Sequence, residues 1–356
     1  MTVPPALISE ILAEQTGIRR RIKQEKERPI LHMDPVPADQ PTTSLTSSRS
    51  PMQKVFYGPN GLRAGWRFLL FVLLFTIWNL VTRQVATRLP ALQRIVEDAM
   101  HGIVTPKFVL AFESIGIIGL FLATLIMARI ERKSFWSYGL SLSGALGSRF
   151  WQGVLWGLTL VSLEILGIFA LHGFSFGGLA LSGLALVKYA IVWAFGFFLV
   201  GIVEEFLFRG YAQFTLSQGI GFWPAAFFLS AVFGVLHLGN TGESWVGALS
   251  VMLFGLFACF TLRRTGTLWF AIGLHAAGDY AETFIYSVPD SGGMATGHLL
   301  NSSFHGPRWL TGGTIGPEGS VLDFAAFLLS FVIFAWLFPG SQNREPFGHA
   351  PKVAAP

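Results

Sequence analysis

Cysteine and charge are both scarce in this sequence. Its 356 residues include one cysteine, which excludes an internal disulfide, and only 13% are Asp, Glu, Lys or Arg. Soluble domains carry about 25% charged residues, and the apolar composition also excludes a disordered or collagen-like chain. The chain is instead 52% hydrophobic, with 34 Phe, 11 Trp and 40 Gly, and glycine is more frequent in membrane helices than in soluble ones. The composition predicts an all-α, polytopic membrane protein.

Long apolar runs divide the chain into predicted membrane spans. A span needs about 20 apolar residues, and we expect about eight transmembrane helices. They cover residues 66–81, 108–128, 150–171, 187–209, 222–238, 245–262, 268–288 and 321–338. The predicted organisation is a polar, largely disordered tail (1–64), a transmembrane domain (65–340) and a second tail (341–356). Residues 6–28 of the first tail have the spacing of a short amphipathic helix.

Lysine and arginine are distributed unevenly between the loops. With the N-terminus inside, the inner segments hold 19 of them and the outer segments hold five. Cytoplasmic loops carry the excess of basic residues, so we expect both tails in the cytoplasm of a cell-membrane protein. Because these basic residues lie beside apolar spans, we expect membrane lipid as a partner and no nucleic acid.

Ionisable residues inside the predicted spans indicate function, because each is costly in hydrocarbon. The fourth span ends with Glu204, Glu205 and Arg209. Glu205 and Arg209 are four residues apart, so they share a helix face and can pair. Glu204 is rotated about 100° from Glu205 and is free to point elsewhere.

Two further spans carry imidazoles. Phe233 and His237 lie in the fifth span, and His275 and Asp279 lie four residues apart in the seventh, with Glu282 close behind. A proton relay would also use such groups. Three other acids stand alone: we expect Glu164 to make a helix-packing hydrogen bond, and Glu113 and Asp323, near span ends, to reach the membrane interface.

Several protease signatures are absent from the sequence. It has no His-Glu-x-x-His zinc helix, no Gly-x-Gly-Asp, and no Gly-x-Ser-x-Gly nucleophile elbow. Glu-Glu-x-x-x-Arg, Phe-x-x-x-His and His-x-x-x-Asp do occur, in that order and on separate helices. This order resembles the CPBP family, that of the CAAX prenyl endopeptidase and of bacteriocin-processing and abortive-infection membrane proteins. Residues 132–140 and 263–268 also look like the family, whose core covers about residues 185–285.

The resemblance implies an eight-helix intramembrane endopeptidase with catalytic groups on helices 4, 5 and 7. It implies that Glu204 is the general base and that His237 helps it to hold a water. It further implies that His275 and residue 279 stabilise the oxyanion, while Glu205 and Arg209 brace the site. The family usually has Asn where this chain has Asp279, and an ionised Asp only accepts hydrogen bonds. Asp279 is therefore either protonated or orients His275.

The motifs can form one site only if the fourth or fifth helix differs from its predicted bounds or tilt. Glu204 falls near the inner end of its predicted span and His237 near the outer end of the next. They can converge if the fourth helix continues past Arg209, or if the fifth is short and tilted.

The cofactor and the function each keep alternatives at this point. We expect no required cofactor, although Glu204, His237 and His275 would also make a His2Glu zinc set with an open position. The predicted function is hydrolysis of a peptide or membrane-protein substrate by activated water. The alternatives are an ion- or proton-coupled transporter and a non-catalytic membrane scaffold. Many transporters contain internal repeats, and none is visible in this sequence.

Overall fold

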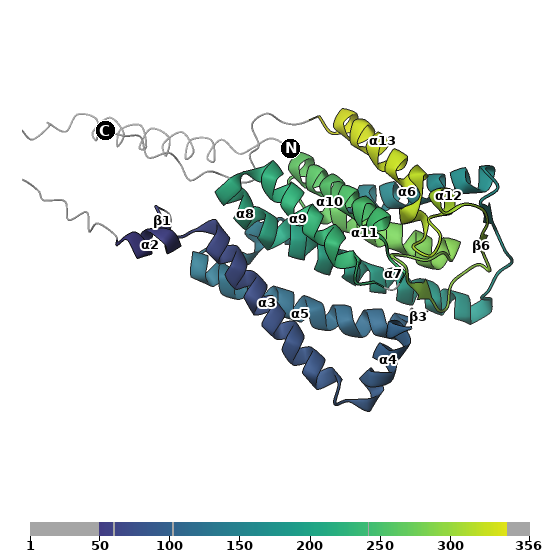
Figure 1. Ribbon diagram of the computed structural model, residues 1–356, viewed down its shortest axis with the longest axis horizontal. Helices are drawn as coiled ribbons and strands as arrows, with labels where there is room; N and C mark the ends of the chain where they lie inside the picture. The colour runs from purple at the N-terminus through teal and green to yellow at the C-terminus, as the bar shows by residue number, and fades with distance from the viewer. Residues whose placement is uncertain (1–49, 60, 102, 241, 340–356) are drawn as a thin grey trace, which may run out of the picture. The chain divides into compact units, whose positions relative to one another are not determined.

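The computed structural model describes residues 50–59, 61–101, 103–240 and 242–339. The amphipathic helix predicted for residues 6–28 and the second tail lie outside these residues. Figure 1 shows a bundle of long helices joined by short segments. The α-helices are α2 (Pro51–Phe56), α3 (Ala64–Ala86), α4 (Pro90–Met100), α5 (Pro106–Glu131), α6 (Ser148–Ala170), α7 (Gly183–Glu205), α8 (Gln213–Ile220), α9 (Phe222–His237), α10 (Trp245–Thr265), α11 (Trp269–Tyr280), α12 (Arg308–Thr311) and α13 (Val321–Leu337).

Short elements complete the described chain. Two π-helical segments, η3 (Phe206–Ala212) and η4 (Ala281–Tyr286), continue α7 and α11, and three 3-10 turns are η1 (Phe135–Tyr138), η2 (Leu142–Gly144) and η5 (Pro317–Gly319). The strands are β1 (Tyr57–Gly58), β2 (Gly61–Leu62), β3 (Ile103–Val104), β4 (Phe174–Ser175), β5 (Met294–Ala295) and β6 (Ser303–Phe304). The pairs β1–β2 and β4–β6 are antiparallel, and β3–β5 is parallel.

Every predicted span coincides with a helix, and the all-α membrane fold is confirmed. Within the described residues, five helices are long and apolar enough to cross a membrane: α3, α5, α6, the continuous helix 183–220, and α10. The apolar helices α9 and α13 are shorter, with 16 and 17 residues. Many large apolar side chains on the outside are exposed, among them Leu155, Val332 and Trp336. An exposed apolar surface of this kind fits lipid contact.

The fourth predicted span is much longer than the sequence analysis expected. Helix α7, η3 and α8 run on as one helical stretch of 38 residues, Gly183–Ile220, with a kink at Gly210. Glu204 therefore lies 16 residues, about 24 Å, before the end of this stretch. The condition for convergence of the motifs is met because the helix continues past Arg209.

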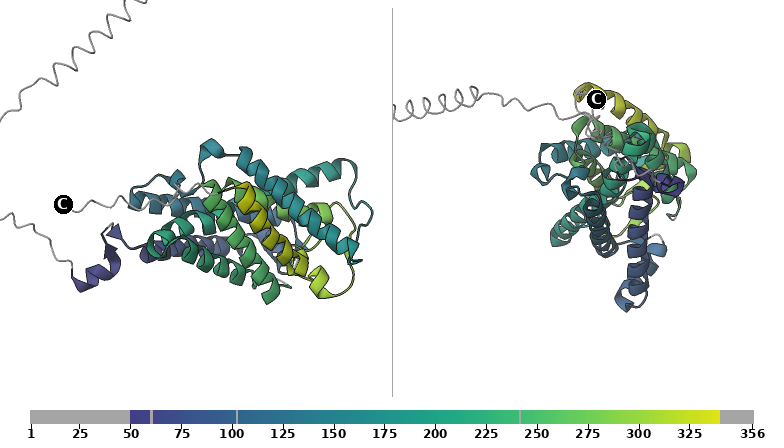
Figure 2. Two further views of the ribbon diagram at one scale, coloured as in Figure 1. Left: turned by 90° about the horizontal axis from the view of Figure 1, so that it is seen from above. Right: turned by 90° about the vertical axis from the view of Figure 1, so that its left-hand side faces the viewer.

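Glycines bring α11 against the two helices beside it. A Cβ at Gly153 or Gly157 of α6 would overlap a backbone oxygen of α11, and one at Gly273 of α11 would overlap the Phe150 carbonyl of α6. A Cβ at Gly201 of α7 would come within 2.9 Å of the Ile272 carbonyl oxygen. Small residues allow membrane helices to approach closely. The glycines hold α11, which carries the His-x-x-x-Asp motif, between α6 and α7, and Figure 2 shows these helices from two further sides.

Two segments that resemble the family outside its main motifs contact each other. The backbone N–H of Leu268 donates to the Gly139 carbonyl at 2.9 Å, and the Trp269 indole donates to the Ser141 carbonyl at 2.8 Å. Gly139 has φ +86°, a conformation that glycine adopts at little cost. The segment after α5 thus fixes the start of α11.

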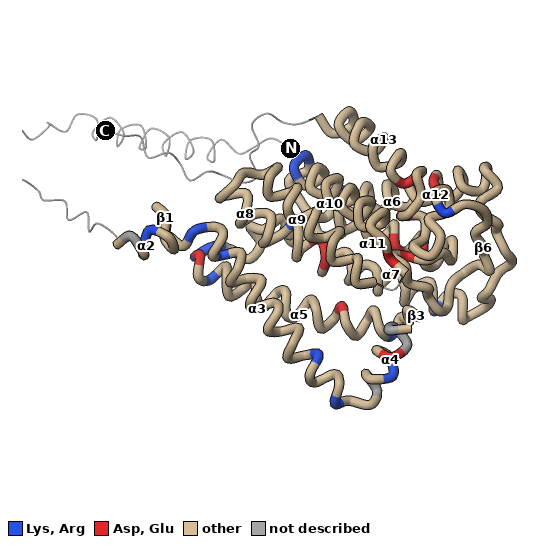
Figure 3. Tube along the Cα trace, in the orientation of Figure 1, with Lys and Arg blue, Asp and Glu red and all other residues tan. Residues whose placement is uncertain are grey.

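Charged side chains gather at two places along the bundle. Glu131 at the end of α5 contacts Arg67 at 2.5 Å and Lys133 at 2.9 Å, and accepts a hydrogen bond from Tyr211. Acidic residues also gather among the helices near α7 and α11 (Figure 3). The second group lies beside the predicted motifs.

Candidate active site

The site contains a buried ion pair between α7 and the segment η3 that continues it. Arg209 donates to Oε1 of Glu205 at 3.2 Å, and both side chains are at most 1% exposed. The pairing predicted from their spacing is therefore confirmed. The same Oε1 accepts a hydrogen bond from Nδ1 of His275 at 2.8 Å. Glu205 thus links α7 to α11 and orients the His275 ring.

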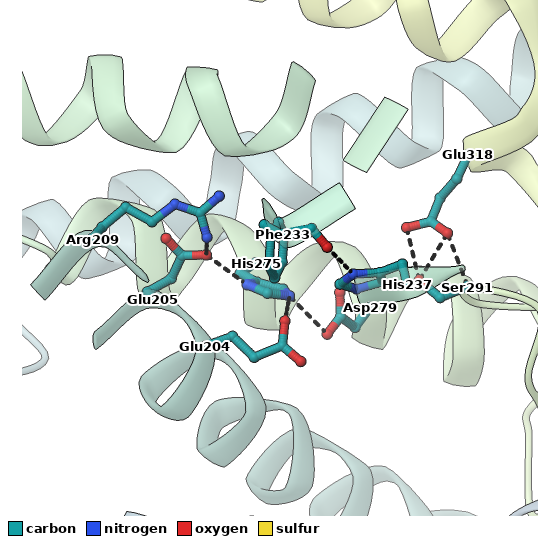
Figure 4. A network of polar contacts seen from close by, with 9 residues as sticks. All are labelled: Glu204, Glu205, Arg209, Phe233, His237, His275, Asp279, Ser291 and Glu318. Carbon is teal, nitrogen blue, oxygen red and sulfur yellow. Dashed lines mark hydrogen bonds and ion pairs between the residues drawn. The ribbon is translucent and has the colours of Figure 1, made fainter. Parts of the chain in front are cut away.

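His275 turns its other nitrogen toward two more carboxylates. Its Nε2 lies 3.7 Å from Oε2 of Glu204 and 3.6 Å from Oδ2 of Asp279. These distances are too long for hydrogen bonds but short for charge interactions. Oε2 of Glu204 is buried and has no hydrogen-bond partner, while its side chain as a whole is 29% exposed. Glu204 therefore has a free oxygen beside an imidazole (Figure 4).

His237 stands on the last turn of α9. Its Nδ1 lies 2.8 Å from the Phe233 carbonyl, which can only accept, so Nδ1–H donates and Nε2 is the acceptor of the neutral ring. Phe233 separates the two imidazoles, with ring centroids 4.6 Å from His237 and 6.4 Å from His275. Within the described part of the chain, no hydrogen bond or ion pair joins His237 to Glu204.

The two π-helical segments lie at the first and third motifs. Segment η3 begins directly after Glu205 and contains Arg209, and Tyr280 alone separates Asp279 from η4. Short π-helical stretches occur often at functional sites because they change the direction of neighbouring side chains. Arg209 lies within η3 and its guanidinium carbon is 4.4 Å from the Phe233 ring centroid.

Glu204, His237, His275 and Asp279 all line one cavity of about 200 Å³. Other acids line it as well: Glu282 of η4, Asp290 and Glu318 of the segment between η4 and α13, and Asp323 of α13. None of the described residues that line it is a lysine or an arginine. The cavity is acidic, and the four residues to which the resemblance gives catalytic roles lie at its wall.

The middle of the chain matches a known family. Residues 186–281 match the family model described as type II CAAX prenyl endopeptidase Rce1-like. This segment is similar to the Rce1-like family. All three motifs of the sequence analysis fall within the Rce1-like segment, which runs from the start of α7 to the start of η4. No curated protein and no solved structure gave a significant match.

The Rce1-like match supports an intramembrane endopeptidase of the CAAX type in general. Together with the apolar helices it also supports a multi-pass membrane protein that acts on peptide or protein substrates in a membrane. The match concerns about a quarter of the chain. The helices before and after it, including α13, contribute further residues to the cavity of the Rce1-like segment.

Two isolated acids differ from their expected roles. Asp323 does not reach an interface: it is 3% exposed, and its carboxylate accepts a hydrogen bond from Ser250 of α10. Glu164 is also 3% exposed, but its Oε1 has no hydrogen-bond partner among the described residues, so the predicted packing bond is wrong. Near-terminal positions in a span can be buried when a loop packs over them, as the segment before α13 does here.

The sequence analysis named Glu282 without giving it a role, and it missed Asp290 and Glu318. Glu282 lies three residues after Asp279 and seven after His275, a spacing that places all three on one helix face, so this signal was present. Asp290 and Glu318 lie in a segment without helical periodicity, and no sequence signal placed them. Burial raises the pKa of Asp290 to about 6. Burial and the nearby Asp290 carboxylate likewise raise the pKa of Glu318 well above its ordinary value.

The alternative zinc set, Glu204, His237 and His275, is not grouped to hold a metal ion in this arrangement. No three His, Cys, Asp or Glu side chains of the described residues are grouped so that they could hold a metal ion. His237 is linked to Phe233, whereas Nε2 of His275 faces two carboxylates. These residues do not fit a metal, and we derive no step through one.

Proposed function

We propose that this protein is an intramembrane endopeptidase in which Glu204 activates a water for attack on a peptide bond. The observation that supports it is the unpaired Oε2 of Glu204, which borders the cavity 3.7 Å from Nε2 of His275. Arg209 balances the charge of Glu205, and Oε1 of Glu205 accepts hydrogen bonds from Arg209 and from Nδ1 of His275. Both glutamates have an Oε2 without a hydrogen-bond partner among the described residues, but of the two only Glu204 lines the cavity, where a water can reach it.

The proposed step transfers a proton from the water to Glu204 as the hydroxyl oxygen bonds to the substrate carbonyl carbon. The carbonyl oxygen becomes an oxyanion, and the protonated Glu204 then gives its proton to the leaving nitrogen as the C–N bond breaks. A donor aimed at an oxyanion is typically worth about 3–4 kcal/mol. His275 can be that donor, because the Glu205 carboxylate on Nδ1 stabilises a protonated ring whose Nε2–H faces the cavity.

His237 and Asp279 take supporting roles in this proposal. The lone pair on Nε2 of His237 can accept a hydrogen bond from the water that Glu204 activates. Oδ2 of Asp279 lies 3.6 Å from Nε2 of His275. This position favours an orienting role for Asp279, since an ionised carboxylate cannot donate to an oxyanion.

The test compares three variants in vesicles that contain synthetic transmembrane peptides, with products identified by mass spectrometry. Glu204→Gln keeps the shape but removes the base, so we expect folded protein and a loss of cleavage of at least 100-fold, the lower range of general-base catalysis. Glu205→Gln should affect folding more than chemistry. Glu97→Gln, the same change at an exposed position of α4, is the matched control. Full activity of Glu204→Gln would refute the proposal.

Independence from metal belongs to the same proposal. We expect purified protein to keep its activity after prolonged chelation, with no stoichiometric zinc in elemental analysis. Activity that is lost on chelation and restored by zinc would make Glu204, His237 and His275 candidate ligands, and the base would have to be Glu205 or another carboxylate.

A further inference from the structure

The cavity beside Glu204 is lined by more carboxyl groups than hydrolysis requires. Six carboxyl groups line it, from α7, η4, α13 and the segments beside them, and the basic groups among its described lining residues are two imidazoles. The six are Glu204, Asp279, Glu282, Asp290, Glu318 and Asp323. The proposed mechanism uses Glu204 and Asp279. It leaves the other four without a role.

Three of these four carboxylates are held by neutral donors. Asp290 accepts from the Thr283 hydroxyl at 2.9 Å, and Glu318 accepts from the backbone N–H and the hydroxyl of Ser291 at 2.9 and 3.0 Å. Asp323 accepts from the Ser250 hydroxyl. Such donors fix the positions of the carboxylates but bring no positive charge.

Glu282 is the exception, because its carboxylate has an oxygen with no partner at all. The residue is 8% exposed, it lines the cavity, and its Oε2 makes no hydrogen bond to any described residue. A buried, unsatisfied carboxylate oxygen is costly. An oxygen at a cavity wall can be satisfied by a group that enters the cavity.

The chemistry of that group follows from the wall. A metal ion does not fit, because no three acidic, histidine or cysteine side chains of the described residues are grouped to hold one. A carboxylate, such as the C-terminus of a peptide, would lie among six other carboxyl groups and find only the two imidazoles as basic groups. An organic cation has N–H donors for the free oxygens and a charge opposite to the wall. The volume of about 200 Å³ is well above the roughly 10–15 Å³ that one water needs, so a group larger than water fits.

We propose that this cavity binds a positively charged nitrogen group of the substrate, an ammonium or a guanidinium, through Glu282, Asp290 and Glu318. The inference rests on the proposed function, since it makes these acids the specificity residues of the same site. The cation would come either from a Lys or Arg side chain or from a free amino terminus. A substrate held there would present a peptide bond to Glu204 at the opposite wall of the cavity.

Binding is tested without any substrate, on the purified full chain in detergent. The probes are n-butylguanidinium and n-butylammonium, with n-butanol as the neutral control and butyrate as the anionic one. A ligand that binds only the folded state raises its melting temperature with concentration. We expect both cations to do so and both controls to have no effect. We expect Glu282→Gln to weaken the apparent affinity at least tenfold, and Glu97→Gln to leave it unchanged.

Two results would overturn the inference. One is the absence of a shift with either cation, or an equal shift with n-butanol. The other is a shift that persists in both Glu282→Gln and Asp290→Asn. If Glu282→Gln does not fold, Glu318→Gln replaces it with the same expectation.

A cleavage experiment identifies the source of the cation and separates this inference from the proposed function. Transmembrane peptides carry either one lysine or the isosteric norleucine, each with a free or an acetylated amino terminus. Preference for lysine that acetylation does not change identifies a side chain, and the converse identifies the amino terminus. Equal cleavage of all four peptides refutes the cation site and leaves the endopeptidase intact. Cation binding without any cleavage refutes the endopeptidase and leaves the cation site intact.

Discussion

Replacing Arg209 by alanine removes the only guanidinium that the structure places on the Glu205 carboxylate. Both side chains are at most 1% exposed, so water cannot take the place of the lost charge. Breaking a buried ion pair by removal of one partner costs about 3–5 kcal/mol. The His275 hydrogen bond of 2.8 Å remains on Glu205, which places the cost near the lower end of that range.

A second contribution comes from the Phe233 ring. The guanidinium carbon of Arg209 lies 4.4 Å from its centroid, and a desolvated cation–π contact is worth about 1–2 kcal/mol. The two contributions together predict that Arg209→Ala loses about 4 kcal/mol of unfolding free energy.

The measurement is unfolding in mixed micelles of increasing denaturing-detergent content, followed by the fluorescence of the 11 tryptophans. Arg83→Ala, at an exposed position of α3, is the matched control and should change stability by less than about 0.5 kcal/mol. The double variant Glu205→Gln/Arg209→Met should lose less than the two single variants added together, because it leaves no unpaired charge. A loss for Arg209→Ala no larger than that of the control would refute a buried, charged pair.

Three further predictions concern packing, pH and topology. Gly153→Ala should lose about 1–3 kcal/mol of stability, because its Cβ would overlap the Phe270 carbonyl. Gly65→Ala, with open space around it, should be neutral. Equal effects of the two changes on thermal melting would contradict the close approach of α6 and α11. Burial raises the pKa of Asp290 to about 6, so the folded state binds this proton more tightly than the unfolded state, and stability should fall as pH rises from about 4 through 6. Asp290→Asn should flatten that fall, and an unchanged pH profile of melting would show that Asp290 is not buried as described. A reporter fused after Pro356 should be cytoplasmic, and a reading on the other side of the membrane would contradict the predicted topology.

Much of the fold and of the motif geometry could be predicted from the sequence because both depend on helical periodicity. Apolar runs placed a helix at each predicted span, and the four-residue spacing of Glu205 and Arg209 predicted their contact. The same rule separates Glu204 from Glu205. Local spacing of this kind requires no knowledge of how the helices pack.

Contacts between segments without periodicity could not be predicted in this way. The continuation of α7 through η3 into α8 depends on packing, and the sequence analysis could give it only as one of two ways for the motifs to converge. Asp290 and Glu318 reach the cavity because the segment between η4 and α13 packs against the bundle through β3–β5 and β4–β6. Two-residue strands leave no pattern in a sequence, so the acidic character of the cavity could be seen only in the folded chain.

The two adjacent glutamates show how burial assigns different roles to identical side chains. Glu205 faces Arg209 and Nδ1 of His275, and these contacts hold it ionised as a fixed support. Glu204, one helical step further round, lines the cavity and has a side chain that is 29% exposed, whereas the Glu205 side chain is fully buried. A general base must be able to gain a proton and then lose it. The pairing of Glu205 therefore contributes to the reaction indirectly: it neutralises one carboxylate within the protein and leaves the other for chemistry.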